Sequence, residues 1–182
     1  VDHSEAETQL DEARESPASK QAQAERRQLT VMFCDLVGST DLAGQLDPED
    51  LREVVRAYQK TADEIIRRFD GHIAQYLGDG LLVYFGYPVA HEDDAQRAAY
   101  SGIGISQEMV NLNARLEADY AVRLSVRIGI HTGPVVVGEM GGDDRQENLA
   151  MGKTPNFAAR LQGLAEPGAV LISDSTRRLL GE

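Results

Sequence analysis

Two aspartates stand where apolar segments end or turn. Asp35 follows the apolar run 29–34, and Asp79 lies in the Gly-Asp-Gly sequence between two short β-prone runs. If the strands that carry them are neighbours, both carboxylates meet at one edge of a sheet. Hard cations such as Mg²⁺ take oxygen ligands, commonly one or two carboxylates together with substrate phosphates. The pair therefore predicts a metal–triphosphate site, although each aspartate alone also fits an ordinary turn residue.

The first half of the chain supplies the elements that must position this pair. Residues 29–34 predict a buried strand, and the polar turn at 38–40 follows it. An acceptor at Asp47 followed by proline and acids predicts a helix start, with apolar residues at helical spacing up to Phe69. Residues 73–77 and 81–85 predict a hairpin with Asp79 at its tip, and 92–116 a second long helix.

The second half alternates short strands and helices. The patterns predict strands at 122–131 and 135–137 on either side of a turn at 132–134, a polar loop at 141–144, and a weaker extended stretch near Leu149. A helix from about 154 to 164, a strand at 169–172 and a short helix capped by Ser173 complete the order. This mixture is typical of an α+β layer rather than a strict βαβ array.

Composition excludes several classes of partner. The formal charge of −12 would repel a nucleic-acid backbone, so no nucleic acid is expected. No apolar run approaches the roughly 20 residues that span a bilayer, so no membrane is expected, and we predict a cytoplasmic domain. The single cysteine, Cys34, is interpreted as a buried structural thiol. Residues 1–27 lack a sustained apolar period and predict a polar linker or tail before a domain at 28–182.

Four motifs in order along the chain closely resemble the catalytic domain of class III adenylyl and guanylyl cyclases of the bacterial soluble type. They cover the chain from about residue 27 to its end, and together they are far more specific than any one alone. The motifs lie at 33–40 (FCDLVGST), 76–80 (YLGDG), 126–133 (VRIGIHTG) and 156–161 (NFAARL).

The resemblance implies a ferredoxin-like, palm-related α+β fold with a mixed, mainly antiparallel sheet, working as a head-to-tail homodimer. It implies that Asp35 and Asp79, with the Leu36 carbonyl, hold two Mg²⁺ or Mn²⁺ ions per site. It places Arg127 on the triphosphate. The partner protomer would supply Asn156 to orient the ribose and Arg160 to stabilise charge at the α-phosphate.

The chain departs from the family pattern where the purine base is read. Gln75 and Leu149 replace the usual lysine and the usual aspartate or threonine, so one polar contact to the base is lost or moves to Asn148. We predict an adenylate cyclase that prefers ATP and uses some GTP. The alternative is a weak or inactive cyclase-like nucleotide-binding and dimerisation module of a larger regulator. A palm-type nucleotidyl transferase shares the metals, but the acidic charge and the Asn-Arg helix count against it.

Three further features bear on the same prediction. The family's final hairpin, with its triphosphate-binding lysine, would follow Glu182, and further domains of the same protein are expected beyond that residue. Residues 141–144 (GGDD) are similar to a diguanylate cyclase signature, but Asp79 already occupies the corresponding turn, so they are interpreted as a loop. The four histidines lack metal-ligand spacing and are given no catalytic role.

Overall fold

A computed structural model describes residues 25–140 and 147–181 of the chain. Within these residues one mixed sheet has the strand order β2-β3-β1-β4-β5, with β6 also paired to β4. Every pairing is antiparallel except that of β6 with β4. The strands are β1 (Glu25–Leu36), β2 (His72–Leu77), β3 (Gly80–Phe85), β4 (Val126–Met140), β5 (Glu147–Met151) and β6 (Val170–Ile172). The predicted α+β fold with a mainly antiparallel sheet is therefore confirmed.

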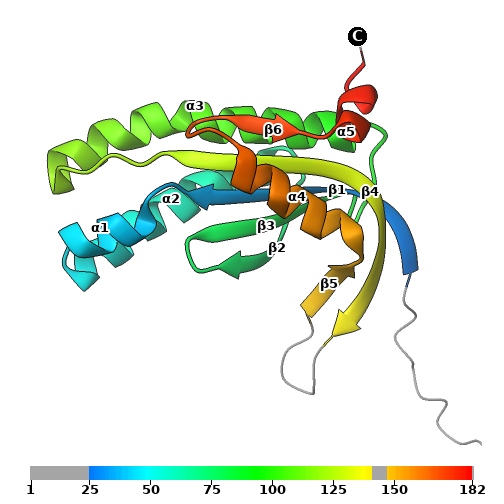
Figure 1. Cartoon of the computed structure of the whole chain (residues 1–182), viewed down its shortest axis with the longest axis horizontal. Helices are drawn as coiled ribbons and strands as arrows, with labels where there is room; N and C mark the ends of the chain where they lie inside the picture. The colour runs from blue at the N-terminus through cyan, green and yellow to red at the C-terminus, as the bar shows by residue number, and fades with distance from the viewer. Residues whose placement is uncertain (1–24, 141–146, 182) are drawn as a thin grey trace, which may run out of the picture.

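Helices cover the two faces of the sheet unequally (Figure 1). The long helices α2 (Pro48–Arg68) and α3 (Asp94–Tyr120) pack on one face, and α4 (Lys153–Leu164) crosses β1 and β4 on the other. Two short helices, α1 (Ser39–Gln45) and α5 (Asp174–Leu179), follow β1 and β6. No helix among the described residues is long and apolar enough to cross a membrane.

The core follows from alternation along the central strands. In β1 and β4, side chains such as Cys34 and Ile128 face α2 and α3, while Val31 and Val135 face α4. All six residues of β3 are buried, since this strand lies between β2 and β1 with both faces covered. Burial raises the pKa of the Cys34 thiol to about 12, so the predicted structural thiol stays protonated.

Several boundaries differ from the sequence prediction. Residues 132–134 do not form a turn, because β4 runs unbroken through them and Gly133 and Pro134 still lie opposite Leu29 and Gln28. Residues 122–125 precede the strand instead of belonging to it. A proline in a strand suggested a break, but pairing with the long β1 carries the chain through this position.

The other differences lie at element ends. β1 begins at Glu25, so the predicted boundary between tail and domain at 27 and 28 falls inside the strand. The polar turn after Asp35 continues into helix α1, and α4 begins at Lys153, which makes Pro155 its third residue. Residues 1–24 of the predicted tail at 1–27, and the predicted loop at 141–144, lie outside the described residues.

Candidate active site

Asp35 and Asp79 are brought together by the pairing of β1 with β3. The register sets Cys34 opposite Leu81, so the next residue of β1 lies beside the turn that opens β3. A Cβ atom at Gly80 would lie 3.5 Å from the Asp35 Oδ1 atom, and the Asp79 carboxyl is near enough to raise the pKa of Asp35. The structure thus places both aspartates at one end of adjoining strands, as the sequence predicted.

The electrostatics of this pair favour a bound cation. Partial burial raises the pKa of Asp35, and the negative charge of Asp79 raises it further. The Leu36 N–H and the Arg127 charge offset only part of this rise. The Asp79 Oδ2 atom is buried without a hydrogen-bond partner. The two carboxyl groups repel each other, and one of their buried oxygens lacks a partner. A positive ion bound between them would offset the repulsion and satisfy that oxygen.

The donor set fits Mg²⁺ or Mn²⁺. The described residues contain no group of three or more His, Cys, Asp or Glu side chains that could hold a metal. The available protein donors are therefore two carboxylates and a backbone carbonyl such as that of Leu36, whose side chain is buried in the core. Hard cations that keep room for water and substrate phosphates suit such a sparse oxygen site.

Arg127 lies directly opposite Asp35 in the register of β1 and β4, on the same face of the sheet. Its positive charge lowers the pKa of Asp35, as the smallest of the effects that act on this carboxyl. The Arg127 Nε atom is buried without a hydrogen-bond partner. A donor left unsatisfied beside two carboxylates is suited to an anion that arrives with the cations, as a phosphate would.

The two residues expected to read the base lie on outer strands. Gln75 follows an irregularity in β2 and pairs with Leu82, which itself pairs with Phe33 of β1. The half-buried Gln75 is therefore on the same sheet face as Asp35 and α4. Leu149 lies in β5 opposite Gly138, and its side chain is outside the described part of the structure.

Helix α4 is fixed on the sheet by a close approach at Gly129. A Cβ atom there would lie 2.1 Å from the Gln162 backbone N and 2.4 Å from the Ala158 carbonyl, so only glycine fits. Near the start of the helix, the Thr154 hydroxyl donates to the Pro134 carbonyl at 2.8 Å. These contacts define which side of α4 faces the sheet, and they explain why the motif at 126–133 has a glycine at Gly129.

Asn156 and Arg160 project from the opposite side of α4. Both are exposed, and neither has a hydrogen-bond or ion-pair partner among the described residues. The apolar side chains of Phe157 and Leu164 are exposed beside them, at 46% and 75%. Because Asn156 and Arg160 point away from their own sheet, their side chains are accessible to a second molecule.

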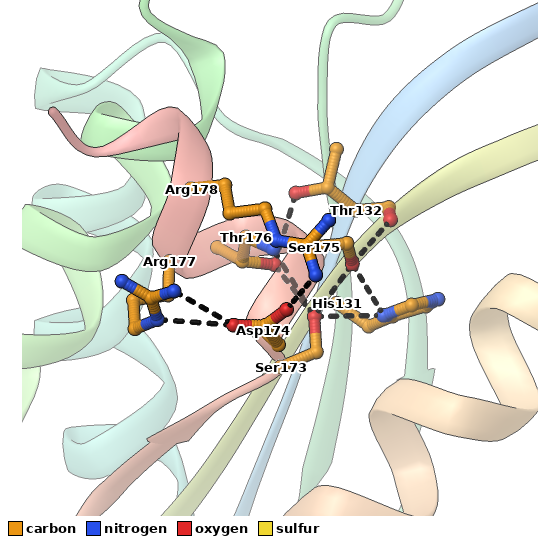
Figure 2. Close-up of polar contacts among 8 residues, drawn as sticks. All are labelled: His131, Thr132, Ser173, Asp174, Ser175, Thr176, Arg177 and Arg178. Atoms are coloured by element: carbon orange, nitrogen blue, oxygen red, sulfur yellow. Dashed lines mark hydrogen bonds and ion pairs between the residues drawn. The ribbon is translucent and has the colours of Figure 1, made fainter.

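His131 is held in a hydroxyl network at the start of α5, as Figure 2 shows. Its Nδ1 atom lies 2.8 Å from the Ser173 Oγ and 3.3 Å from the Ser175 Oγ. Since Ser175 donates its hydroxyl proton to the Thr132 carbonyl, it can only accept from the ring, which favours the proton on Nδ1. The ring also packs on Phe157 at 4.4 Å between centroids. These contacts give His131 a structural task that spacing alone did not reveal.

Sequence reasoning missed a contact that reaches the turn of Asp79. The Gln59 Nε2 atom in α2 donates to the Gly78 carbonyl at 3.0 Å. Gln59 and Gly78 are separated in the sequence, and nothing in the residues around Gln59 marks it, so only the packing of α2 beside the hairpin could show the contact.

The sequence matches the family model described as "Adenylate and Guanylate cyclase catalytic domain" over residues 21–182. Among curated proteins, it is 31% identical over 139 residues to "Adenylate cyclase 1" of Rhizobium meliloti (strain 1021), covering 76% of this chain and 21% of that protein. The chain spans between 15% and 32% of the length of the first three curated relatives it matches.

Two solved structures share the fold closely. The guanylyl cyclase Cya2 superposes with a TM-score of 0.84 at 31% identity, covering 87% of this chain and 81% of that one. The adenylyl cyclase CyaB from P. aeruginosa superposes with a TM-score of 0.83 at 33% identity, covering 87% and 82%. The relatives therefore include enzymes named for each of the two purine nucleotides.

Proposed function

We propose a function for this chain, which belongs to the adenylate and guanylate cyclase catalytic domain family. In this proposal it converts ATP to 3′,5′-cyclic AMP and pyrophosphate, with some use of GTP. The observation that carries this proposal is the Asp35 and Asp79 pair, with its unsatisfied buried oxygen, beside Arg127. Family membership and the geometry of the site support the nucleotide cyclase activity, and the preference for ATP is the finer part of the proposal.

Each residue of the site has a stated task in this reaction. Asp35, Asp79 and the Leu36 carbonyl would hold two Mg²⁺ or Mn²⁺ ions, which lower the pKa of the ribose 3′-hydroxyl and neutralise the phosphates when bound. Arg127 holds the triphosphate through its guanidinium. The 3′-oxygen bonds to the α-phosphorus, the bond to the bridging oxygen breaks, pyrophosphate leaves with that electron pair, and the hydroxyl proton goes to solvent.

The second protomer of a head-to-tail homodimer completes the site. Asn156 orients the ribose, and Arg160 stabilises the negative charge that grows on the α-phosphate oxygens in the transition state. The outward direction of both side chains on α4 supports this arrangement, since neither is engaged by a described residue of its own protomer. A homodimer related by a twofold axis would contain two equivalent sites.

The direct test is product formation from ATP or GTP with Mn²⁺, resolved by chromatography. We expect cyclic product, and we expect Asp35→Ala and Asp79→Ala each to lower turnover at least about 100-fold, because each removes a cation ligand. Asp174→Ala is the matched control, since Asp174 is an exposed aspartate paired with Arg177 and Arg178. Tight nucleotide binding without any product would instead identify the chain as a non-catalytic nucleotide-binding module.

A further inference from the structure

The turn that carries Asp79 is tied to the rest of the molecule by helix α2. Gly78, the residue before Asp79, has a left-handed backbone with φ +66°, and a Cβ at this glycine would meet nothing within 4 Å. A loosely packed turn of this kind can move as a unit. The hydrogen bond from the Gln59 Nε2 atom to the Gly78 carbonyl, at 3.0 Å, anchors it from the helix side.

Helix α2 is itself fixed at the neighbouring residue. The Tyr58 side chain is fully buried, and its hydroxyl lies 3.2 Å from the Cys34 Sγ atom, next to Asp35 in β1. The charges of Asp35 and Asp79 both contribute to a raised pKa of Tyr58, after burial and Cys34 as the larger causes. Residues 58 and 59 of one helix thus contact the strand of Asp35 and the turn of Asp79 respectively.

From this arrangement we infer that Gln59 is a positioning residue, which holds the turn between β2 and β3 so that the Asp79 carboxyl stays against Asp35 in the geometry that binds divalent cations. The inference depends on the proposed function only in taking Asp35 and Asp79 as cation ligands. Gln59 need not touch the nucleotide or the reacting atoms. Removing its donor would free the turn and weaken cation binding more than it would weaken the fold.

The test is binding of Mn²⁺ alone, followed through the electron paramagnetic resonance signal of the free ion. In Gln59→Met, which keeps the side-chain length but removes the amide donor, we expect the Mn²⁺ midpoint to rise about fivefold to tenfold. Gln96→Met is the matched control, because the Gln96 Nε2 atom donates to the Leu180 carbonyl at the same 3.0 Å in another part of the molecule. Its midpoint should change less than about twofold.

Turnover gives a second, separable result. In Gln59→Met the Mn²⁺ concentration needed for half-maximal rate should rise, while kcat at saturating Mn²⁺ stays within about twofold of the wild type. The inference is overturned if the Mn²⁺ midpoint of Gln59→Met equals that of the wild type. It is also overturned if Asp79→Ala binds Mn²⁺ as tightly as the wild type does. Mn²⁺ binding that depends on both Asp79 and Gln59, in a protein that makes no cyclic product, supports the inference and contradicts the proposed function instead.

Discussion

At the scale of single residues, Asp35 combines a proposed role in cation binding with a cost to the fold. Its folded-state pKa is raised, so the folded state holds the proton more tightly than the unfolded state does, and stability falls as the pH rises past the unfolded value of about 3.9. Asp35→Asn removes the ionisation and the repulsion from Asp79. We therefore expect this variant to unfold at a higher temperature than the wild type at neutral pH without metal.

The gain in stability expected for Asp35→Asn is modest, because the Asp35 carboxyl is partly exposed and solvent screens its repulsion from Asp79. An increase on the order of 1 kcal/mol would raise the melting temperature by about 2–4 °C in a domain of this size. Thermal unfolding with and without Mn²⁺ checks it, since added Mn²⁺ should stabilise the wild type and leave Asp35→Asn unchanged. Asp119→Asn, at an exposed position near the end of α3, should show no gain.

We also expect base selectivity to depend on single residues. A glutamine amide at Gln75 can offer a donor or an acceptor, and Leu149 offers neither, so we predict modest preference for ATP over GTP. Gln75→Lys together with Leu149→Asp should raise the ATP to GTP ratio of kcat/KM about tenfold, equivalent to roughly 1.4 kcal/mol. Gln75→Lys alone should do less. Complete exclusion of GTP by the wild type, or no change in the double variant, would show that these positions do not read the base.

The sequence indicated some of these residues and could not indicate others. Asp35 and Asp79 were predictable as a pair because each follows or interrupts an apolar strand, and adjoining strands bring such ends together. The position of Arg127 opposite Asp35 depends on the exact register of β1 and β4, and the hydrogen bond of Gln59 to Gly78 depends on how α2 lies beside a hairpin. Register and helix placement are set by long-range packing, which local patterns do not contain.

At the scale of elements, the joint between α4 and β4 is the most constrained packing near the proposed site. At Gly129 any side chain would strike the backbone of α4, which cannot move without disturbing the whole helix. We expect Gly129→Ala to destabilise the fold by about 2–4 kcal/mol, which lowers the melting temperature by roughly 5–15 °C. Chemical or thermal unfolding of the purified variant measures this loss.

A glycine within helix α4 itself, Gly163, provides the control. A Cβ at Gly163 would meet nothing within 4 Å, and alanine favours a helix over glycine by about 1 kcal/mol. Gly163→Ala should therefore raise the melting temperature while Gly129→Ala lowers it. Equal effects of the two substitutions would mean that helix α4 does not approach β4 as closely as the structure shows.

The elements also show why the predicted boundaries were less accurate than the predicted order. Apart from the missed helix α1 and the division of β4 into two strands, the predicted order was correct, because most elements have their own apolar period, as in α2 with its buried Val54, Tyr58 and Ile65. The break predicted at 132–134 was wrong because glycine and proline were weighed without the partner strand. β1 is long enough to pair with β4 on both sides of Pro134, and that pairing decides the outcome.

At the scale of the whole molecule, the homodimer proposal makes a quantitative prediction. In the proposed site, one protomer supplies the cation ligands and its partner supplies Arg160. Asp79→Ala removes a cation ligand and Arg160→Ala removes the partner's contribution, so each variant alone should be nearly inactive. In an equal mixture about half of the dimers are mixed, and each mixed dimer has one intact site of two. Activity should then return to about a quarter of the wild-type value.

Cyclic product measured before and after mixing the two variants checks this recovery. Mixing Asp79→Ala with Asp35→Ala is the control, since both defects lie on the same side of the site and no intact site can form. Failure of the first mixture to recover activity, in a protein whose wild type is active, would contradict the exchange of α4 residues between protomers.

The tight joint at Gly129 has a consequence for how two such sites would communicate. In the proposed homodimer, strand β4 would carry Arg127 for one site, while α4, which packs on the same strand, would carry Asn156 and Arg160 for the other. A shift of β4 when nucleotide binds must therefore carry α4 with it. In that dimer we expect occupancy of one site to alter affinity at the second, and by thermodynamic reciprocity the second would alter the first equally. Calorimetric titration of the dimer with a non-reactive ATP analogue should depart from the isotherm of independent sites.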